Sequence, residues 1–187
     1  VSIERTSKGY TLGVHIADVG HFVQEDSALD KDALERGTSV YYANGVVPML
    51  PFQLSSNLCS LKPDVERLAM TVLMEMDNKG VMRSYKVFPS VIKSKRRLTY
   101  TEAYRLLQEG DDDGEYGKVF PALEKMAELA LILKKNRIAE GSVEFDLPES
   151  LITLAKNGKV ESVSVAERNQ AHELIEEFML AANRAVA

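Results

Sequence analysis

The sequence has few of the residues that hold extracellular or membrane proteins together. It has one cysteine, Cys59, among 187 residues, so no internal disulfide can form. It has no tryptophan. No apolar run approaches the roughly 20 residues that a membrane-spanning helix needs. Hydrophobic residues still make up 45% of the chain, which is enough for the core of one domain. These features favour a reducing, cytoplasmic location. The first residue is Val1 rather than Met, which leads us to expect a piece of a longer protein.

Positive charge is also scarce. The chain has 23 basic and 28 acidic residues, a formal net charge of -5, which argues against a domain that binds nucleic acid through overall positive charge. The basic residues concentrate in one place, at Lys93, Lys95, Arg96 and Arg97. This cluster suits either a solvated turn or a contact with phosphate groups. Any nucleic-acid contact must therefore be local.

Motifs for self-contained catalysis are missing. The three histidines, His15, His21 and His172, are far from metal-ligand spacing with the cysteine, and such histidines are more often structural. The acidic run at 111–113 lies between two glycines, which is typical of a solvated loop rather than a cation site. No phosphate-binding glycine loop or nucleophile elbow is present. These residues alone therefore give no indication of a self-contained catalytic or metal-binding site.

Hydrophobic patterns predict one α+β domain over 1–187, with a mixed, largely antiparallel sheet wrapped by helices. Strands are expected at 1–5, 10–18, 38–42, 46–47, 69–76, 85–91, 143–145 and 151–163, the last range turning at 157–158. Leu12, Val14 and Ile16 should alternate onto one face. Four helices are expected. The first should run from a cap at 26 or 27 to 37, and the second from a cap at 99 or 101 to 110. The third should run from near 121 to 141, and the fourth over about 169–186. The first of these helices should have its apolar positions at Leu29, Ala33 and Leu34.

The stretch 38–61 contains an unusual order of residues. A strand-like start is followed by a turn at Asn44-Gly45, and then Pro48 and Pro51 fix the backbone on either side of two apolar residues. We predict a rigid extended loop here and no helix. A short apolar stripe follows at Leu54, Leu58 and Leu61. The stretch is either an irregular connector packed by these leucines or part of a functional site.

The last expected helix has two faces. The apolar face consists of Leu174, Ile175, Phe178, Met179 and Ala182. The polar face consists of Asn169, His172, Glu176 and Asn183. The polar face is either an ordinary solvated surface or, if it lines a cleft, a binding surface.

Six blocks, in this order, resemble those of a known family. They are VHIADVGHFV at 14–23, RGTSVYYANGVVPMLP at 36–51, LSSNLCSL at 54–61, KRRLTY at 95–100, GSVEFDLPE at 141–149 and RNQAHELIEEFMLAAN at 168–183. They resemble the RNB-type catalytic domain of the ribonuclease II and ribonuclease R family, and the ribonuclease R branch is the better match. The resemblance implies an enzyme that hydrolyses single-stranded RNA from its 3′ end to nucleoside 5′-monophosphates. It also implies magnesium ions held by four aspartates.

The resemblance is incomplete at both ends. The family's last aspartate pair should lie just upstream of Val1. The family's downstream arginine and its oligonucleotide-binding barrels also have no counterpart here. We therefore expect an incomplete RNB-type domain that binds no metal and has no activity by itself. The alternative is a non-catalytic RNA-binding or structural module on the same scaffold.

The resemblance also implies roles for residues that are present. Tyr41 matches a tyrosine that stacks on a base near the RNA 3′ end and limits the length of the final product, and Tyr100 matches a second tyrosine near the terminal nucleotide. Stacking of this kind is independent of base sequence, whereas the residues alone would suit core tyrosines equally well. Glu176 and Glu177 match paired glutamates, one of which selects RNA through the ribose; we favour Glu176 because it shares the polar face. Asp18 matches an aspartate of the family, although its position alone favours a turn or cap.

Overall fold

The computed structural model describes residues 1–43, 45–111, 114–117, 119–143, 150–155 and 157–187. These residues form two compact units. Unit 1 comprises Val1–Ile16, Lys62–Glu144 and Arg168–Ala187, and unit 2 comprises Ala17–Leu61 and Phe145–Glu167. Helices and antiparallel strand pairs occur together, which confirms the α+β prediction.

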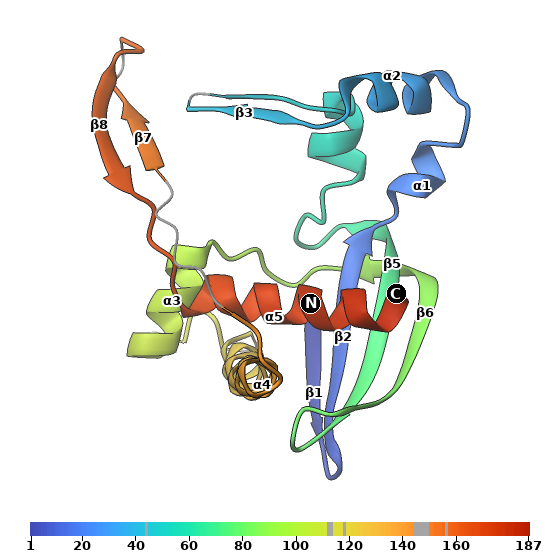
Figure 1. The fold of residues 1–187 in the computed structure, drawn as a ribbon, viewed down its shortest axis with the longest axis vertical. Helices are drawn as coiled ribbons and strands as arrows, with labels where there is room; N and C mark the ends of the chain where they lie inside the picture. Colours follow the sequence, from blue (N-terminus) through green and yellow to red (C-terminus); the bar gives the residue numbers. More distant parts are fainter. Residues whose placement is uncertain (44, 112–113, 118, 144–149, 156) are drawn as a thin grey trace. The chain divides into compact units, whose positions relative to one another are not determined.

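Unit 1 contains a four-stranded sheet in the order β1-β2-β5-β6 (Figure 1). The strands are β1 (Ser2–Thr6), β2 (Gly9–Ala17), β5 (Glu66–Asp77) and β6 (Met82–Lys93). β1 pairs antiparallel with β2, and β5 pairs antiparallel with β6. Both hairpins were predicted, because turn residues separate runs of strand-forming residues in each.

Gly9, the first residue of β2, is required by the packing of the two hairpins. Its φ is +147°, and a Cβ atom at this position would lie 2.1 Å from the carbonyl oxygen of Met76. Any other residue would collide with the backbone of β5. The glycine therefore lets the first hairpin approach the second one closely.

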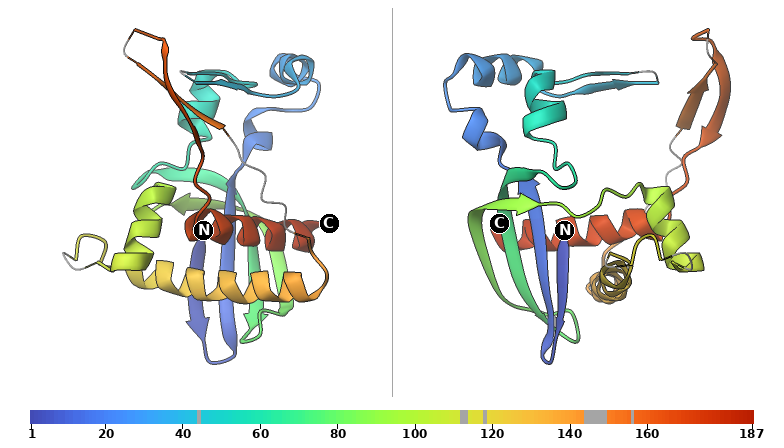
Figure 2. Two further views of the ribbon diagram at one scale, coloured as in Figure 1. Left: turned by 60° about the vertical axis from the view of Figure 1, so that its left-hand side comes forward. Right: turned by 180° about the vertical axis from the view of Figure 1, so that it is seen from behind.

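Two helices, α4 (Phe120–Ala139) and α5 (Gln170–Val186), lie across one face of this sheet, and α3 (Tyr100–Glu109) lies beside them (Figure 2). α4 contacts β1, α5 contacts β5, and α3 contacts both other helices. The predicted caps of α3 are confirmed: Thr99 is the N-cap and Gly110 the C-cap.

The core of unit 1 lies between the sheet and these helices. Its largest inaccessible side chains are Tyr10, Leu12, Val14, Met74, Leu129 and Phe178. Of the three residues predicted to alternate onto one face of β2, Leu12 and Val14 are buried, whereas Ile16 is 44% exposed. Ile16 lies next to the end of β2 and outside the buried cluster.

Unit 2 begins with two helices, α1 (Val19–Phe22) and α2 (Ala28–Arg36). The Ser27 side chain accepts a hydrogen bond from the backbone of the first turn of α2, and Gly37 is the C-cap, as predicted. Of the three apolar positions expected along α2, Ala33 is buried but Leu34 is 82% exposed. The predicted helix through Leu34 is present, but the Leu34 side chain lies outside the buried part of unit 2.

The stretch 38–61 contains a hairpin and a helical turn. β3 (Val40–Tyr42) pairs antiparallel with β4 (Gly45–Val47), which confirms the expected strands; Asn44 of the predicted turn lies outside the described residues. A π-helix follows at Leu54–Leu58, and the Cys59 backbone N–H donates to the Leu54 carbonyl at 2.8 Å. The prediction of an extended loop without a helix is thus wrong.

A second hairpin completes unit 2. β7 (Ser150–Leu154) pairs antiparallel with β8 (Val160–Val165), as the turn at 157–158 predicted. Of the strand expected at 143–145, Val143 is irregular, and the rest lies outside the described residues. Two of the three acidic residues at 111–113 also lie outside them. Within the described ranges, none of the helices combines the length and apolar composition needed to cross a bilayer.

Candidate nucleic-acid interface

In unit 1, the N-terminal ends of α3 and α5 bring two aromatic rings together. Tyr100 is the first residue of α3, and its ring stacks on His172 with 3.9 Å between ring centroids and 22° between ring planes. Tyr100 is 45% exposed. The alternative of a core tyrosine is therefore wrong for Tyr100, which presents an aromatic surface to solvent.

Local hydrogen bonds fix the positions of both rings. The Thr99 backbone N–H donates to the Glu102 carboxylate at 2.7 Å, and the Glu102 backbone N–H donates to the Thr99 hydroxyl at 3.2 Å. This reciprocal capping box sets the start of α3 directly before Tyr100. At the start of α5, the Asn169 side chain accepts from Ala171, and the His172 ring reaches back to Asn169. The sequence therefore positions both rings through helix starts.

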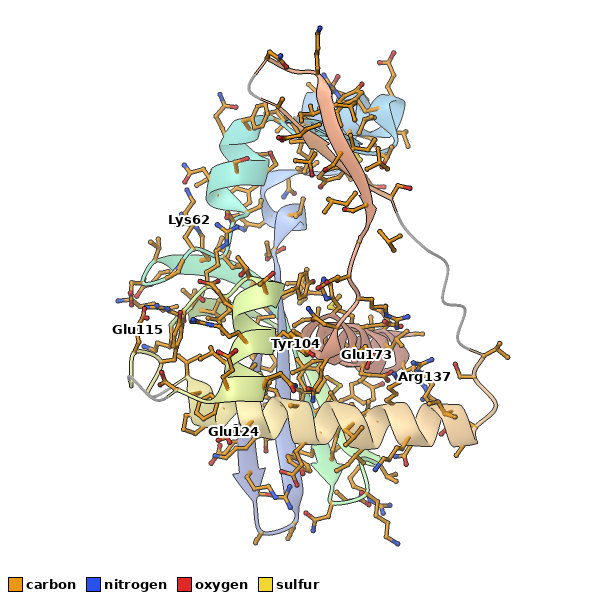
Figure 3. The ribbon with its side chains drawn as sticks, turned by 90° about the vertical axis from the view of Figure 1, so that its left-hand side faces the viewer. Lys62, Tyr104, Glu115, Glu124, Arg137 and Glu173 are labelled. Carbon is orange, nitrogen blue, oxygen red and sulfur yellow. The ribbon has the colours of Figure 1, made fainter. Side chains whose placement is uncertain are left out.

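The two neighbouring glutamates of α5 have different environments. The Glu176 side chain is 42% exposed and accepts a hydrogen bond from Arg168 at 2.7 Å. The Glu177 side chain is 4% exposed and accepts two hydrogen bonds from Arg137, at 2.9 Å and 2.7 Å. Figure 3 shows Arg137 on the side of α4 that faces α5. Solvent therefore reaches Glu176, whereas Glu177 is a buried partner in an ion pair between two helices.

Tyr41 belongs to unit 2 and lies in β3, opposite Val46. It is 80% exposed, and its neighbour Tyr42 is 60% exposed. The core-tyrosine alternative is thus wrong for Tyr41 as well. Tyr42 was not selected from the sequence, although its place in the same short strand could have indicated it. The β3–β4 hairpin thus presents two aromatic side chains to solvent.

Asp18 and Cys59 have local structural roles in unit 2. The Asp18 carboxylate accepts a hydrogen bond from the His21 backbone N–H at 3.2 Å and caps α1, in agreement with the cap expected from its position. Burial, and then the charge of Asp18, raise the pKa of the Cys59 thiol above its ordinary value. Because the thiolate is the reactive form, Cys59 is a poor nucleophile at neutral pH.

The basic segment after β6 is divided between two environments. Arg96 is paired with Glu115 at 2.6 Å and lies over the Tyr116 ring, 4.7 Å from its centroid. Lys93, Lys95 and Arg97 are exposed. Arg96 therefore has a structural role, and a phosphate contact by the other three stays a prediction.

Comparison with known proteins gives a consistent result. Residues 1–187 match the model of the RNB domain. Ribonuclease R of Thermotoga maritima is 44% identical over 189 residues, covering 100% of this chain and 27% of its own length. Mycoplasma genitalium RNase R in complex with ribose methylated single-stranded RNA matches 100% of this chain and 29% of that chain, with a TM-score of 0.94 and 29% identity. Yeast Ssd1, a pseudonuclease, covers 99% of this chain with a TM-score of 0.74 and 21% identity, which shows a shared fold. The chain thus spans about a quarter of the length of the curated relatives it matches.

Proposed function

Because this chain belongs to the RNB domain family, we propose that it is part of a 3′-to-5′ exoribonuclease that hydrolyses single-stranded RNA to nucleoside 5′-monophosphates. The observation that supports this most directly is the match to the RNB domain over residues 1–187. The Thermotoga maritima relative, which matches the whole chain at 44% identity, is a ribonuclease R. The activity is assigned to the whole enzyme, of which this chain is one portion.

We propose that this chain holds the 3′ end of the RNA. Tyr41 and Tyr100 are both exposed, at 80% and 45%, and every base has a flat face on which such rings can stack. The similarity to an RNase R that binds single-stranded RNA supports RNA as the ligand. Stacking at two tyrosines would hold RNA of any sequence, as a degradative exonuclease requires.

The choice of RNA over DNA is assigned to Glu176. A carboxylate can accept a hydrogen bond from a ribose 2′-hydroxyl, which DNA lacks. The Glu176 side chain is accessible at 42%, whereas Glu177 is 4% exposed and bonded to Arg137. The accessible member of the pair is therefore the better candidate.

Magnesium is the metal that the family resemblance implies for the whole enzyme. Among the described residues, no three His, Cys, Asp or Glu side chains are grouped to hold a metal ion. We propose that the metal ligands lie in a part of the enzyme outside this chain, as the family resemblance implies. A cytoplasmic location is part of the same proposal, and the single cysteine is compatible with it.

The second candidate is a non-catalytic RNA-binding or structural protein on the same scaffold. The pseudonuclease Ssd1 shares the fold, so the fold alone does not require catalysis. The full-length protein should be incubated with magnesium and single-stranded RNA labelled at its 5′ end. Progressive shortening with release of mononucleotides is expected for the enzyme. Binding without shortening would favour the second candidate.

The same assay locates the catalytic groups. The 187-residue chain tested alone should release no mononucleotides, because the proposed metal ligands are elsewhere. Release by the pure chain would contradict that placement, and the full-length protein is the positive control.

A further inference from the structure

The stack between Tyr100 and His172 uses only one side of the tyrosine ring. The two rings are nearly parallel, at 22°, with centroids 3.9 Å apart, so His172 covers one face of Tyr100. The tyrosine is nevertheless 45% exposed. Part of Tyr100 is therefore open to solvent, although His172 lies against one face of its ring.

His172 is held in place by the start of α5. Its Nδ1 atom lies 3.3 Å from the Asn169 backbone nitrogen, whose N–H it accepts in the capping box, and 2.9 Å from the Asn169 Oδ1 atom. α5 is anchored in turn by Leu174 and Phe178, which are 3% and 0% exposed. An imidazole fixed in this way supports the Tyr100 ring, because the imidazole could move away from that ring only by breaking the hydrogen bonds of the helix cap.

We propose that His172 is a positioning residue, which holds the Tyr100 ring from behind so that its opposite face receives the terminal base of the RNA. This rests on the proposed function of Tyr100. His172 makes no contact with RNA in this arrangement; it restricts the rotation of Tyr100 before RNA arrives. A preorganised ring loses less conformational freedom when a base binds, so binding is tighter.

Two substitutions separate this role from the role of His172 in the helix cap. His172→Gln removes the ring but retains a side chain that can accept the Asn169 N–H, since Gln serves at this position of a capping box. His172→Phe retains a flat ring but has no acceptor atom. The first variant should disturb Tyr100, and the second should disturb the start of α5.

The test is RNA binding by the full-length protein without divalent metal. Two single-stranded RNAs of one sequence are compared, one of which lacks the base of its 3′-terminal nucleotide. Loss of a stacked base should weaken binding to the native protein by roughly 5- to 150-fold. His172→Gln should reduce this preference to about threefold or less, whereas His172→Phe should retain most of it. Tyr100→Ala should abolish it, and adding His172→Gln to Tyr100→Ala should change nothing further.

Three results would overturn the inference. They are an absent preference in the native protein, a full preference in His172→Gln, and additive effects of the two substitutions. The proposed function is judged separately, from shortening of intact RNA in magnesium. If the full-length protein shortens RNA but His172→Gln keeps the full preference for RNA with its terminal base, only the inference about His172 is refuted. If the full-length protein does not shorten RNA but His172→Gln removes this preference, only the proposed exonuclease activity is refuted.

Discussion

Unit 1 and unit 2 differ in how much apolar surface they bury. In unit 1, Leu12, Met74, Leu129 and Phe178 are inaccessible to solvent. Among the described residues of unit 2, only Ala33 and Leu54 are buried. An isolated two-stranded hairpin is marginally stable in water, and unit 2 contains two of them. The comparison indicates that unit 1 maintains the structure, whereas unit 2 presents surface for contacts.

The two tyrosines that we propose to stack on RNA bases belong to different units. Tyr100 is held at the start of a capped helix and against His172, whereas Tyr41 lies in a three-residue strand of unit 2. Side chains on a packed scaffold are positioned more precisely than those on short ribbons. We therefore expect Tyr100 to be the more rigid of the two.

The largest expected difference concerns local opening of the backbone. Amides of β5 in unit 1 should exchange hydrogen only in openings close to global unfolding, which costs about 5–15 kcal/mol in typical domains. Amides of β3–β4 and β7–β8 should exchange much faster, because few buried side chains hold these hairpins. Hydrogen exchange followed by mass spectrometry measures both in one experiment. Equal protection in the two units would contradict the comparison.

Removing a core side chain of unit 1 should have the next largest effect. Phe178 is 0% exposed, and Phe178→Ala should reduce the opening free energy of β5 amides by about 3–5 kcal/mol through lost burial and the cavity left behind. Leu34→Ala in unit 2 is the matched control. Leu34 is 82% exposed, so its effect should be within about 0.5 kcal/mol.

The glutamate pair of α5 should show opposite effects on stability and on recognition. Glu177→Ala removes the carboxylate that balances the charge of Arg137, which retains its hydrogen bond to Ser142, and should destabilise unit 1 by about 3 kcal/mol. Glu176→Ala should change stability little, but should narrow the preference for RNA over DNA by about ten- to a hundredfold, since a hydrogen bond to a charged group contributes roughly 1.5–3 kcal/mol.

This comparison requires matched RNA and DNA oligonucleotides at one salt concentration, because phosphate contacts depend on salt. A change of preference in Glu177→Ala alone would show that the choice within the pair is wrong. If neither variant changes the preference for RNA over DNA, the polar face of α5 is an ordinary solvated surface.

Tyr41→Ala should affect RNA without affecting the fold. Its side chain is 80% exposed, so stability should be unchanged, while loss of one stacked base weakens the hold on short RNA by about 1–3 kcal/mol. In the full-length enzyme the end products should become longer while cleavage continues. Gel analysis of the final products measures this, with Tyr42→Ala as a neighbouring control. Unchanged product length would remove Tyr41 from the site.

Helix starts and hairpins were predictable because the signals for them are local. Thr99 followed by Glu102 predicts a capped helix, and the structure contains that cap. The π-helix at Leu54–Leu58 was missed although Leu54, Leu58 and Leu61 follow the i, i+4, i+7 spacing of a helix, because the prolines before it favoured an extended loop. Burial at Leu34 and Ile16 depends on which elements cover them, and a local pattern contains no such information.

The candidate site shows the same limit. The identity of Tyr41 and Tyr100 came from the resemblance, whereas the Tyr100–His172 stack joins residues far apart in the sequence. The burial of Glu177 could, however, be predicted from the sequence. It follows Leu174 by one helical turn and precedes Ala181 by another, so it belongs to the face that packs against the core. Glu176 is rotated by about 100° on the same helix.

The smallest expected effect concerns a hydrogen-bonded chain on the sheet of unit 1. It runs from Ser2 Oγ to His15 Nε2 at 2.9 Å, from His15 Nδ1 to Thr71 Oγ1 at 2.8 Å, and from Thr71 Oγ1 to Ser90 Oγ at 2.6 Å. Ser90 donates to the Ala69 carbonyl. Thr71 therefore donates to Ser90, and His15 donates from Nδ1 to Thr71. A neutral His15 with its proton on Nδ1 satisfies every atom of this chain.

Burial lowers the pKa of His15 below its ordinary value. Folding therefore favours the neutral imidazole, and the unfolded chain binds more protons as the pH falls. The resulting stabilisation is complete above about pH 6.5, the ordinary pKa of histidine, and is lost as the pH falls below that value. Hydrogen exchange of β2 amides at pH 7.5 and 5.5, corrected for intrinsic exchange rates, should show the loss. His15→Gln should reduce the pH dependence, whereas His21→Gln should retain it. Equal pH dependence in His15→Gln and the native protein would show that this chain of hydrogen bonds does not couple folding to protonation.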